Sequence, residues 1–341
     1  MISTLVFPDR PFPHPYKTCV VLGHVGDKEG KKESKSKGNY TPPEVILERV
    51  RMEFAVVSAA AAKLAETEGV AFIAREDYEG LDLTGESAKV KVYGAGAEVS
   101  LELRPGKGMP RRIVAMHAAD LAKLGATPGP EPLKVMPVEV PRLPAAQKIW
   151  VEDPTTPAPG ADAFRWFFYA SSPSWSNTRH SLTNVRLEQK EFLVKLRNVY
   201  SFFTIYANID GFDPTRDKGR DPRTRAELDR WMLGELAGAT QKVTASLEGY
   251  LLYDAARALV DLVESLSNWY VRRSRARFWA PGNFREGTVS QDKSDAYATL
   301  YEVLVAIAGL AAPFVPYFAE ELWQNLVRGP FPEAATSVHL S

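Results

Sequence analysis

A run of small and charged residues near the start of the chain has the clearest chemical potential. Residues 30–39 read Gly-Lys-Lys-Glu-Ser-Lys-Ser-Lys-Gly-Asn, with four lysines, two serines and no large apolar side chain. Such a run has nothing to bury in a core, which predicts a surface loop. Compact lysine ammonium groups can follow phosphate oxygens as charge moves during transfer, so the run suits polyphosphate. Composition alone favours the simpler alternative, a solvated basic loop.

A second run, residues 268–279, combines arginines with aromatic side chains. On a helix Arg272 and Arg275 are three positions apart, and Arg273 and Arg277 are four apart. Their guanidinium groups would therefore cluster and could bind phosphates or stack on bases. The aromatic residues beside them are Trp269, Tyr270, Phe278 and Trp279. The residues leave an alternative equally open: a bundle helix whose arginines pair with acids and whose aromatics lie in the core.

Composition limits the classes of protein that can position these groups. A chain of 341 residues with 45% hydrophobic content can bury cores for two or three domains. Forty-two Lys and Arg balance 42 Asp and Glu, so nucleic-acid binding would need local patches. A single cysteine, Cys19, excludes an internal disulfide framework and a cysteine zinc site, and we expect no metal site. Residues 1–25 hold no apolar run long enough for a signal peptide or membrane span, so we expect a cytoplasmic, non-membrane protein.

The first quarter of the chain predicts a buried strand and a helix. Residues 18–22 form a continuous apolar run, typical of a parallel strand covered on both faces, with Cys19 buried in it. Such a strand needs neighbours for its backbone groups. His24 follows as a loop residue that either lines the site or has an ordinary structural role. Residues 44–57 are predicted as a helix capped by Thr41.

Strand-like patterns set residues 49–152 apart from the segments around them. Strand-like alternation at 89–93 and 98–103 surrounds a glycine-rich turn, and a third run at 112–116 could pair with these strands. Residues 119–124 predict a short helix, and the proline-rich stretch 127–159 reads as a linker. We find no phosphate loop or catalytic group here and expect a small α+β or mostly β domain.

From residue 162 the pattern is helical. Residues 162–171 form an aromatic helix, residues 192–206 an amphipathic one, and the chain breaks at 208–222, a predicted domain boundary. Apolar stripes at helical spacing then predict an antiparallel bundle. The stripes are Leu228, Met232, Leu236, Ala239, Val243 and Leu247; Leu259, Leu262, Val263, Leu266 and Tyr270; Leu300, Val303, Leu304, Ile307, Ala311 and Phe314; and a short fourth one at 319–326.

Four motifs in order resemble one enzyme family. Residues 32–36, Lys-Glu-Ser-Lys-Ser, followed by Gly-Asn, resemble the lysine-methionine-serine-lysine-serine loop of class I aminoacyl-tRNA synthetases. Residues 160–166, Gly-Ala-Asp-Ala-Phe-Arg-Trp, are similar to the motif that follows this loop in the family, here about a hundred residues late. Residues 268–279 resemble the isoleucyl branch, and residues 312–323 resemble a later helix shared with the valyl and leucyl enzymes.

The resemblance implies roles for particular residues. Lys35 would be the main catalytic lysine and Lys32 the first lysine of the motif, acting on ATP with Mg²⁺. Two positions depart from the family, because Glu33 replaces the usual methionine and Lys37 the usual leucine. The implied ATP-binding set is Lys32, Ser34, Lys35, Ser36, Gly38 and Asn39. The implied tRNA-binding set is Trp269, Arg272, Arg273, Arg275 and Arg277, with isoleucine tRNA as the expected partner.

The resemblance also implies the fold and its division. We expect a mainly α chain with an α+β portion: a remnant of a Rossmann-type catalytic domain (1–48), the insert (49–152), connecting helices (153–210) and an anticodon-binding bundle (223–328). The family's His-Ile-Gly-His motif is absent from the sequence. We therefore expect a C-terminal portion of an isoleucine-tRNA ligase without its N-terminal catalytic half and editing domain. It would use isoleucine and ATP only if another chain supplied that half. The alternative is a non-catalytic tRNA-binding protein.

Overall fold

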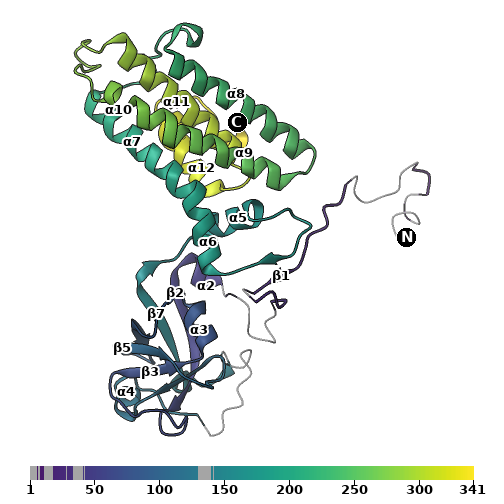
Figure 1. The fold of residues 1–341 in the computed structure, drawn as a ribbon, viewed down its shortest axis with the longest axis vertical. Coiled ribbons are helices and arrows are strands. Elements are labelled where there is room, and N and C mark those ends of the chain that lie inside the picture. Colours follow the sequence, from purple (N-terminus) through teal and green to yellow (C-terminus); the bar gives the residue numbers. More distant parts are fainter. Residues whose placement is uncertain are drawn as a thin grey trace.

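The computed structural model describes residues 6, 8–10, 18–27, 29–33, 41, 43–129, 140 and 142–341. Figure 1 shows a helical bundle at one end of the molecule and a β-barrel at the other. Helices α5 (Ala161–Ala170) and α6 (Leu182–Gln189) lie between them, beside the short strand β1 (Val25–Gly26). The chain is therefore mixed helical and β.

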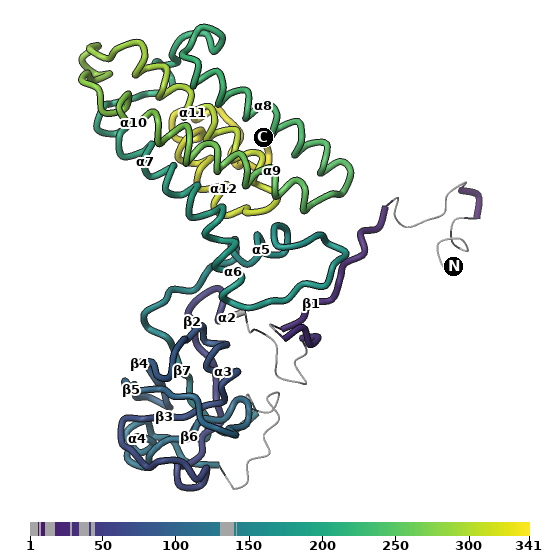
Figure 2. Tube along the Cα trace, viewed as in Figure 1, coloured from purple at the N-terminus to yellow at the C-terminus, as the bar shows by residue number. Residues whose placement is uncertain are grey.

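Six strands close into a barrel in the order β2-β6-β3-β5-β4-β7 (Figure 2). Alternate residues of β2 face opposite sides: Val50, Met52, Phe54 and Val56 enter the main barrel core, whereas Ala55 and Val57 join a smaller cluster. This period of two is what a strand with two apolar faces requires. The bounds are β2 Arg49–Ser58, β3 Val70–Ile73, α3 Arg75–Gly80, β4 Ala88–Tyr93, β5 Glu98–Pro105, β6 Ile113–Met116, α4 Ala118–Lys123, the 3₁₀ turn η3 Ala145–Gln147 and β7 Lys148–Pro157.

The structure confirms part of the prediction for residues 49–152 and corrects the rest. The strands expected at 89–93 and 98–103 are β4 and β5, which pair in antiparallel fashion, and α4 matches the expected short helix. The run at 112–116 forms β6, which pairs with β2 and β3 instead of β4 and β5. The stretch expected to be a linker contains β7, a barrel strand paired with β2 and β4. Strand β3 and helix α3 were not predicted.

The helix predicted at residues 44–57 is wrong. Helix α2 spans only Pro43–Leu47, and β2 begins at Arg49. Four of the residues from Val50 to Val57 are β-branched or aromatic and prefer a pleated surface. Pairing with β6 on one side and β7 on the other then favours the strand over the helical spacing.

The buried strand predicted at residues 18–22 is also wrong. This segment is irregular, and Val21 and Leu22 are 73% and 70% exposed. Cys19 is exposed as well, contrary to the expected burial. Only β1, just beyond, forms a strand, and within the described part of the chain its strand partner is β8 (Thr178–Arg179), paired in parallel. Among the described residues no further strand lies beside the apolar run, so its backbone groups have no sheet to join.

The two ends of the barrel meet where they join the rest of the chain. Arg49 at the start of β2 is paired with Pro157 at the end of β7. The amide of Gly160 donates to the carbonyl of Ile46 at 2.9 Å, which links α5 to α2. Asp82 fixes the barrel to α6 by accepting from Thr183 Oγ1 at 2.9 Å and Arg186 Nε at 2.5 Å. The barrel is thus inserted through one narrow joint.

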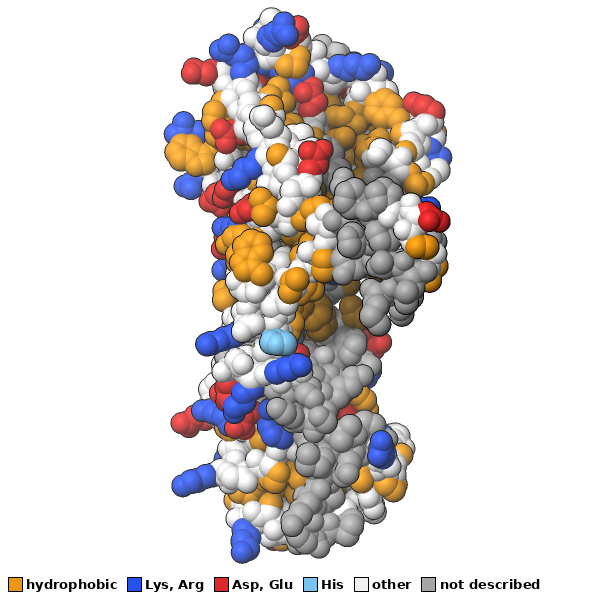
Figure 3. Space-filling model, turned by 90° about the vertical axis from the view of Figure 1, so that its right-hand side faces the viewer, with side chains coloured by type: hydrophobic (Ala, Val, Ile, Leu, Met, Phe, Trp, Pro, Cys, Tyr) orange, Lys and Arg blue, Asp and Glu red, His pale blue; other side chains and the backbone are white. Residues whose placement is uncertain are grey.

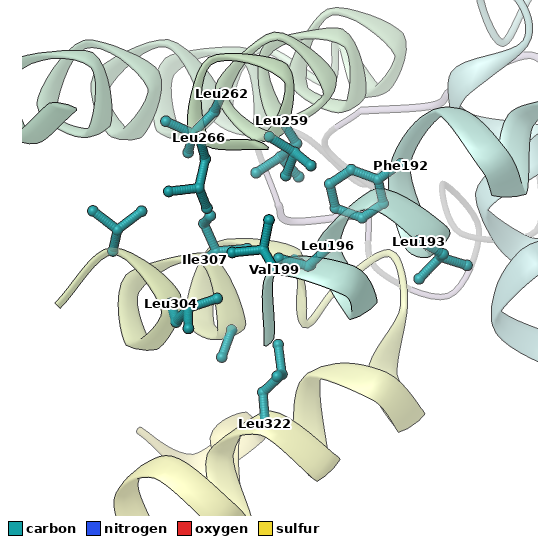
Figure 4. Close-up of a cluster of buried hydrophobic side chains, with 14 of the residues drawn as sticks. Phe192, Leu193, Leu196, Val199, Leu259, Leu262, Leu266, Leu304, Ile307 and Leu322 are labelled. Carbon is teal, nitrogen blue, oxygen red and sulfur yellow. The ribbon is translucent and has the colours of Figure 1, made fainter. Parts of the chain in front are cut away.

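The bundle confirms the predicted apolar stripes. Buried side chains from residues 192–199, 259–266, 304–307 and 322 meet in one core (Figure 4). The predicted stripes at 259–270 and 300–314 are buried throughout, whereas Leu228, Leu236, Ala239 and Leu247 of the first stripe are half-buried. This core includes residues on both sides of the break at 208–222, so the break is a packed loop within the bundle. The bounds are η4 Lys190–Val194, α7 Lys195–Asp210, η5 Pro222–Thr224, α8 Glu227–Glu248, α9 Leu252–Glu264, η6 Ser265–Val271, α10 Arg272–Phe278, α11 Gln291–Ala311, α12 Pro316–Trp323, η7 Gln324–Arg328 and η8 Val338–Leu340.

Helix α11 is the one described helix long and apolar enough to cross a membrane. It lies in the middle of the bundle, and its Leu300, Val303 and Ile307 are fully buried. It is therefore the central core helix of the bundle. Figure 3 shows acidic and basic side chains interspersed on one face of the bundle and barrel, with scattered hydrophobic side chains between them.

Candidate functional site

The turn that follows β1 carries the described start of the lysine run. Asp27 closes this turn: its Oδ1 accepts from the amides of Glu29 at 3.0 Å and Lys31 at 2.9 Å, and its own amide donates to the Lys31 carbonyl at 2.8 Å. Gly30 has a φ of 83°, a backbone angle that favours glycine. The chain then returns antiparallel, with Lys32 bridged to Gly26.

Of the predicted ATP-binding residues, the structure describes Lys32 alone. It lies at the surface beside Lys31, whose Nζ is 2.7 Å from Glu29 Oε2. This hydrogen bond raises the pKa of Lys31 above its usual value. The predicted catalytic Lys35, together with Ser34, Ser36, Gly38 and Asn39, lies outside the described residues.

His180 joins this turn from the other side of the sequence. It directly follows β8; its amide donates to the Gly26 carbonyl at 2.8 Å, and its Nδ1 is 3.0 Å from Glu33 Oε1. Because a carboxylate can only accept, Nδ1 carries the proton in this bond. Thr41 Oγ1 lies 3.3 Å from the same nitrogen. No sequence signal indicated this contact, since Glu33 and His180 are 147 positions apart.

A cleft of about 430 Å³ lies between the turn and the barrel. The turn and residues 180–182 line one part of it, and Met52, α3 and Arg111 line the other. Its titratable walls are mostly acidic: Asp27, Glu29, Glu33, Glu76 and Glu79, against Lys31, Arg111 and His180. The described lining of the cleft therefore carries more acidic than basic groups and would by itself repel a polyanion.

His24, the other candidate near this site, has a backbone role in the structure. Its amide donates to Asn177 Oδ1 at 2.9 Å, and its carbonyl accepts from the amide of Thr178 at 2.9 Å. The side chain is exposed. Of the two alternatives left open by the sequence, the observed contacts are those of the structural one.

The arginine-rich stretch forms the second candidate site, at the junction of the π-helical segment η6 and α10. Arg272, Arg273 and Arg275 are exposed. The Arg273 guanidinium lies 4.8 Å from the ring centre of Trp269, which is 52% exposed. Three cations and a solvent-facing indole therefore share one surface, which suits phosphates and bases.

Arg277 does not belong to that surface. Its guanidinium donates to both carboxylate oxygens of Asp229, at 2.8 and 2.6 Å, and pairs with Asp292. Burial opposes its charge, but the hydrogen bond to Asp229 raises the pKa of Arg277 above its usual value. Tyr270 donates to Asp229 at 2.6 Å, and burial raises the pKa of this phenol well above its usual value. Arg277 is thus occupied inside the bundle, as the alternative reading of the sequence anticipated.

Metal ligation has no support among the described side chains. They include no group of three or more His, Cys, Asp or Glu that could hold a metal ion.

The helices that carry the arginine surface lie in a region matched by a known domain family. Residues 229–341 match the anticodon-binding domain of tRNA ligases. Residues 1–181, more than half of the chain, match the class I tRNA synthetases for isoleucine, leucine, methionine and valine. The chain belongs to this family.

Two isoleucine–tRNA ligases are among the relatives with similar sequences. The isoleucine–tRNA ligase of Thermus thermophilus is 48% identical over 183 residues, which are 53% of this chain and 17% of that ligase. The isoleucine–tRNA ligase of Clostridium tetani is 44% identical over 181 residues, again 53% of this chain and 17% of the ligase. The match thus spans about a sixth of these relatives. The free methionyl-tRNA synthetase of Mycobacterium tuberculosis aligns with a TM-score of 0.39 at 15% identity, covering 48% of this chain and 32% of that one.

Proposed function

We propose that the chain takes part in isoleucine–tRNA ligation, the ATP-dependent charging of tRNA with isoleucine, in the cytoplasm. The observation that carries this proposal is the 48% identity to an isoleucine–tRNA ligase over 183 residues, within a chain of the same family. Because the match spans 17% of that ligase, the chain would contribute one part of the reaction, as a C-terminal portion. The remainder, including the site that binds isoleucine, would come from an N-terminal half.

In this proposal the lysine run acts on ATP. Lys32 and Lys35, with Ser34, Ser36, Gly38 and Asn39, would hold the phosphates and stabilise pyrophosphate as it leaves. Mg²⁺ would arrive bound to the phosphates of ATP. The locked turn at residues 27–31 supports this role, because a fixed base lets charged groups act without reorganising during the reaction.

The helical bundle would bind isoleucine tRNA. Trp269, Arg272, Arg273 and Arg275 are its proposed contacts, and their shared exposure supports this. The same proposal divides the chain by role into the lysine-bearing part (1–48), the barrel insert (49–152), connecting helices (153–210) and an anticodon-binding bundle (223–328), and the last two share one hydrophobic core. This proposal assigns no role to the barrel insert.

The test measures tRNA affinity across a salt series, with isoleucine tRNA and valine tRNA. We expect preferential binding to isoleucine tRNA that weakens as salt rises, because each phosphate contact releases counterions. In the variant Arg272→Ala/Arg275→Ala, affinity falls and the slope of log affinity against log salt drops by about 1 to 2. The matched control is Arg75→Ala/Arg104→Ala, two exposed arginines of the barrel, which keeps wild-type affinity. Unchanged binding in the first variant would contradict the proposed surface.

A second candidate, a non-catalytic tRNA-binding protein, is favoured by one observation. The bundle has a continuous buried core, whereas the described sheet beside the lysine run has only the strands β1 and β8. Lys35→Ala separates the two candidates. In the ligase this change abolishes ATP-dependent charging once the N-terminal half is supplied; in a pure tRNA binder it alters nothing.

A further inference from the structure

We propose that Glu33 and His180 form a positioning pair that fixes the start of the lysine run against β8. This inference rests on the proposed phosphate-binding function of that run and adds two residues to it. Neither residue would touch the phosphates; both would act through residues 31–33.

One residue, His180, fastens both ends of the turn. Its backbone amide holds Gly26, where the turn begins, and its imidazole holds Glu33, where the turn ends. Between these points Asp27 closes the turn from within. The position of Lys32 is therefore set by the strand β8 and not by the loop alone.

Both side chains of this pair are largely shielded from water. The His180 side chain is 1% exposed and that of Glu33 is 19% exposed. The imidazole packs edge-on against Phe164, with ring centres 5.1 Å apart, and its ring centre lies 6.1 Å from that of Phe168. Its Nε2 is buried and has no hydrogen-bond partner in the described chain, so the ring makes its polar link through Nδ1. Glu33→Ala would leave the buried Nδ1 with only its longer contact to Thr41 Oγ1 at 3.3 Å, and His180→Phe would leave the Glu33 carboxylate facing a ring that cannot donate.

The pair includes position 33, one of the two positions at which the chain departs from the family's loop. The corresponding loop of the family usually carries methionine there, an apolar side chain suited to an aromatic surface. In this chain the aromatic surface holds a histidine at its edge, and a carboxylate becomes the matching side chain. The double variant Glu33→Met/His180→Phe should therefore restore an apolar version of the same contact.

Hydrogen exchange of the full chain, followed by mass spectrometry, tests the anchoring. The amide of Glu33 donates to the Val25 carbonyl at 3.1 Å. In His180→Phe and in Glu33→Ala, we expect exchange over residues 29–33 to be at least about tenfold faster, because the turn opens more often. In the double variant it should return to within about threefold of wild type. The peptide covering the bundle residues 255–266 is the internal control for global unfolding. Unchanged exchange in both single variants would overturn the proposal.

Titration with inorganic pyrophosphate and Mg²⁺ separates this inference from the proposed function. We expect the single variants to bind about tenfold more weakly, a loss of about 1.4 kcal/mol, and the double variant to recover. If Lys35→Ala abolishes binding and the single variants leave it unchanged, the function stands and the pair has no positioning role. If Lys35→Ala binds like wild type, or wild type does not bind, the phosphate function fails, and the exchange experiment still decides whether the pair anchors the turn.

Discussion

At the scale of single residues, Asp229 is a carboxylate that links three helical segments of the bundle. It is fully buried, accepts two hydrogen bonds from Arg277 and one from Tyr270, and joins α8 to η6 and α10. From the sequence, a binding surface and a bundle helix with paired arginines were equally consistent with this stretch. The sequence could not decide because the partner of Arg277 lies 48 positions away, on another helix. Helical spacing predicts which arginines share a face, but not which of them meets a buried acid.

We expect Asp229→Ala to lower the free energy of unfolding by about 3 to 5 kcal/mol, because it leaves the Arg277 charge buried without its main partner. Urea unfolding followed by circular dichroism measures this loss. The matched control is Asp292→Ala, which removes the more exposed partner of Arg277 and should cost less than about 1 kcal/mol. Equal urea midpoints for wild type and Asp229→Ala would contradict this account of the network.

At the scale of elements, the local spacing of apolar residues was enough to predict the core of the bundle but not the position of the strands. Leu259, Leu262 and Leu266 could be placed in the core from spacing alone, because a helix makes its own backbone hydrogen bonds. Val21 and Leu22 could not, since a strand is buried only by neighbours that the local sequence does not name. Phe54 fits both a helical stripe and a strand. The pairing of β2 with β6 and β7 determines that it lies in a strand.

The candidate site shows the same division. Its charged residues Lys32, Arg272 and Arg275 were visible from their order in the sequence. The contacts that hold Lys32 were not, because Glu33 and His180 meet only after β1 pairs with β8.

The joint between barrel and helices predicts that the barrel can be removed. Ile46 and Gly160 are hydrogen-bonded across it, so a short Gly-Ser link in place of residues 49–157 spans the gap. We expect the shortened chain to keep a cooperative helical unfolding transition and tRNA affinity within about twofold, since the bundle core contains no barrel residue. Circular dichroism and the tRNA titration measure both. Some stability should be lost near α2, whose Val45 and Ile46 pack on the barrel core. A shortened chain without a cooperative transition would show that the bundle needs the barrel.

At the scale of the whole molecule, the chain should not activate isoleucine alone. The described residues beside the lysine run form a two-stranded sheet, and the sequence lacks the His-Ile-Gly-His motif that binds ATP in the family. We expect isoleucine-dependent exchange of pyrophosphate into ATP to stay at background with the purified chain. The full isoleucine–tRNA ligase of Thermus thermophilus, assayed alongside, is the positive control. Exchange above background would show that this chain contains a working adenylation site.

The contact between His24 and Asn177 also sets an order of events during synthesis. These residues are 153 positions apart, and a ribosome adding about 5 to 20 residues per second needs on the order of ten seconds to make the chain between them. All strands of the barrel emerge within that interval. Once β2 and β7 have paired, the barrel behaves as a short link in the chain, and the entropy lost on joining β1 to β8 is that of a much smaller loop. Pairing of β2 with β7 thereby shortens the effective loop that closes when β1 meets β8, next to the turn that holds the lysines.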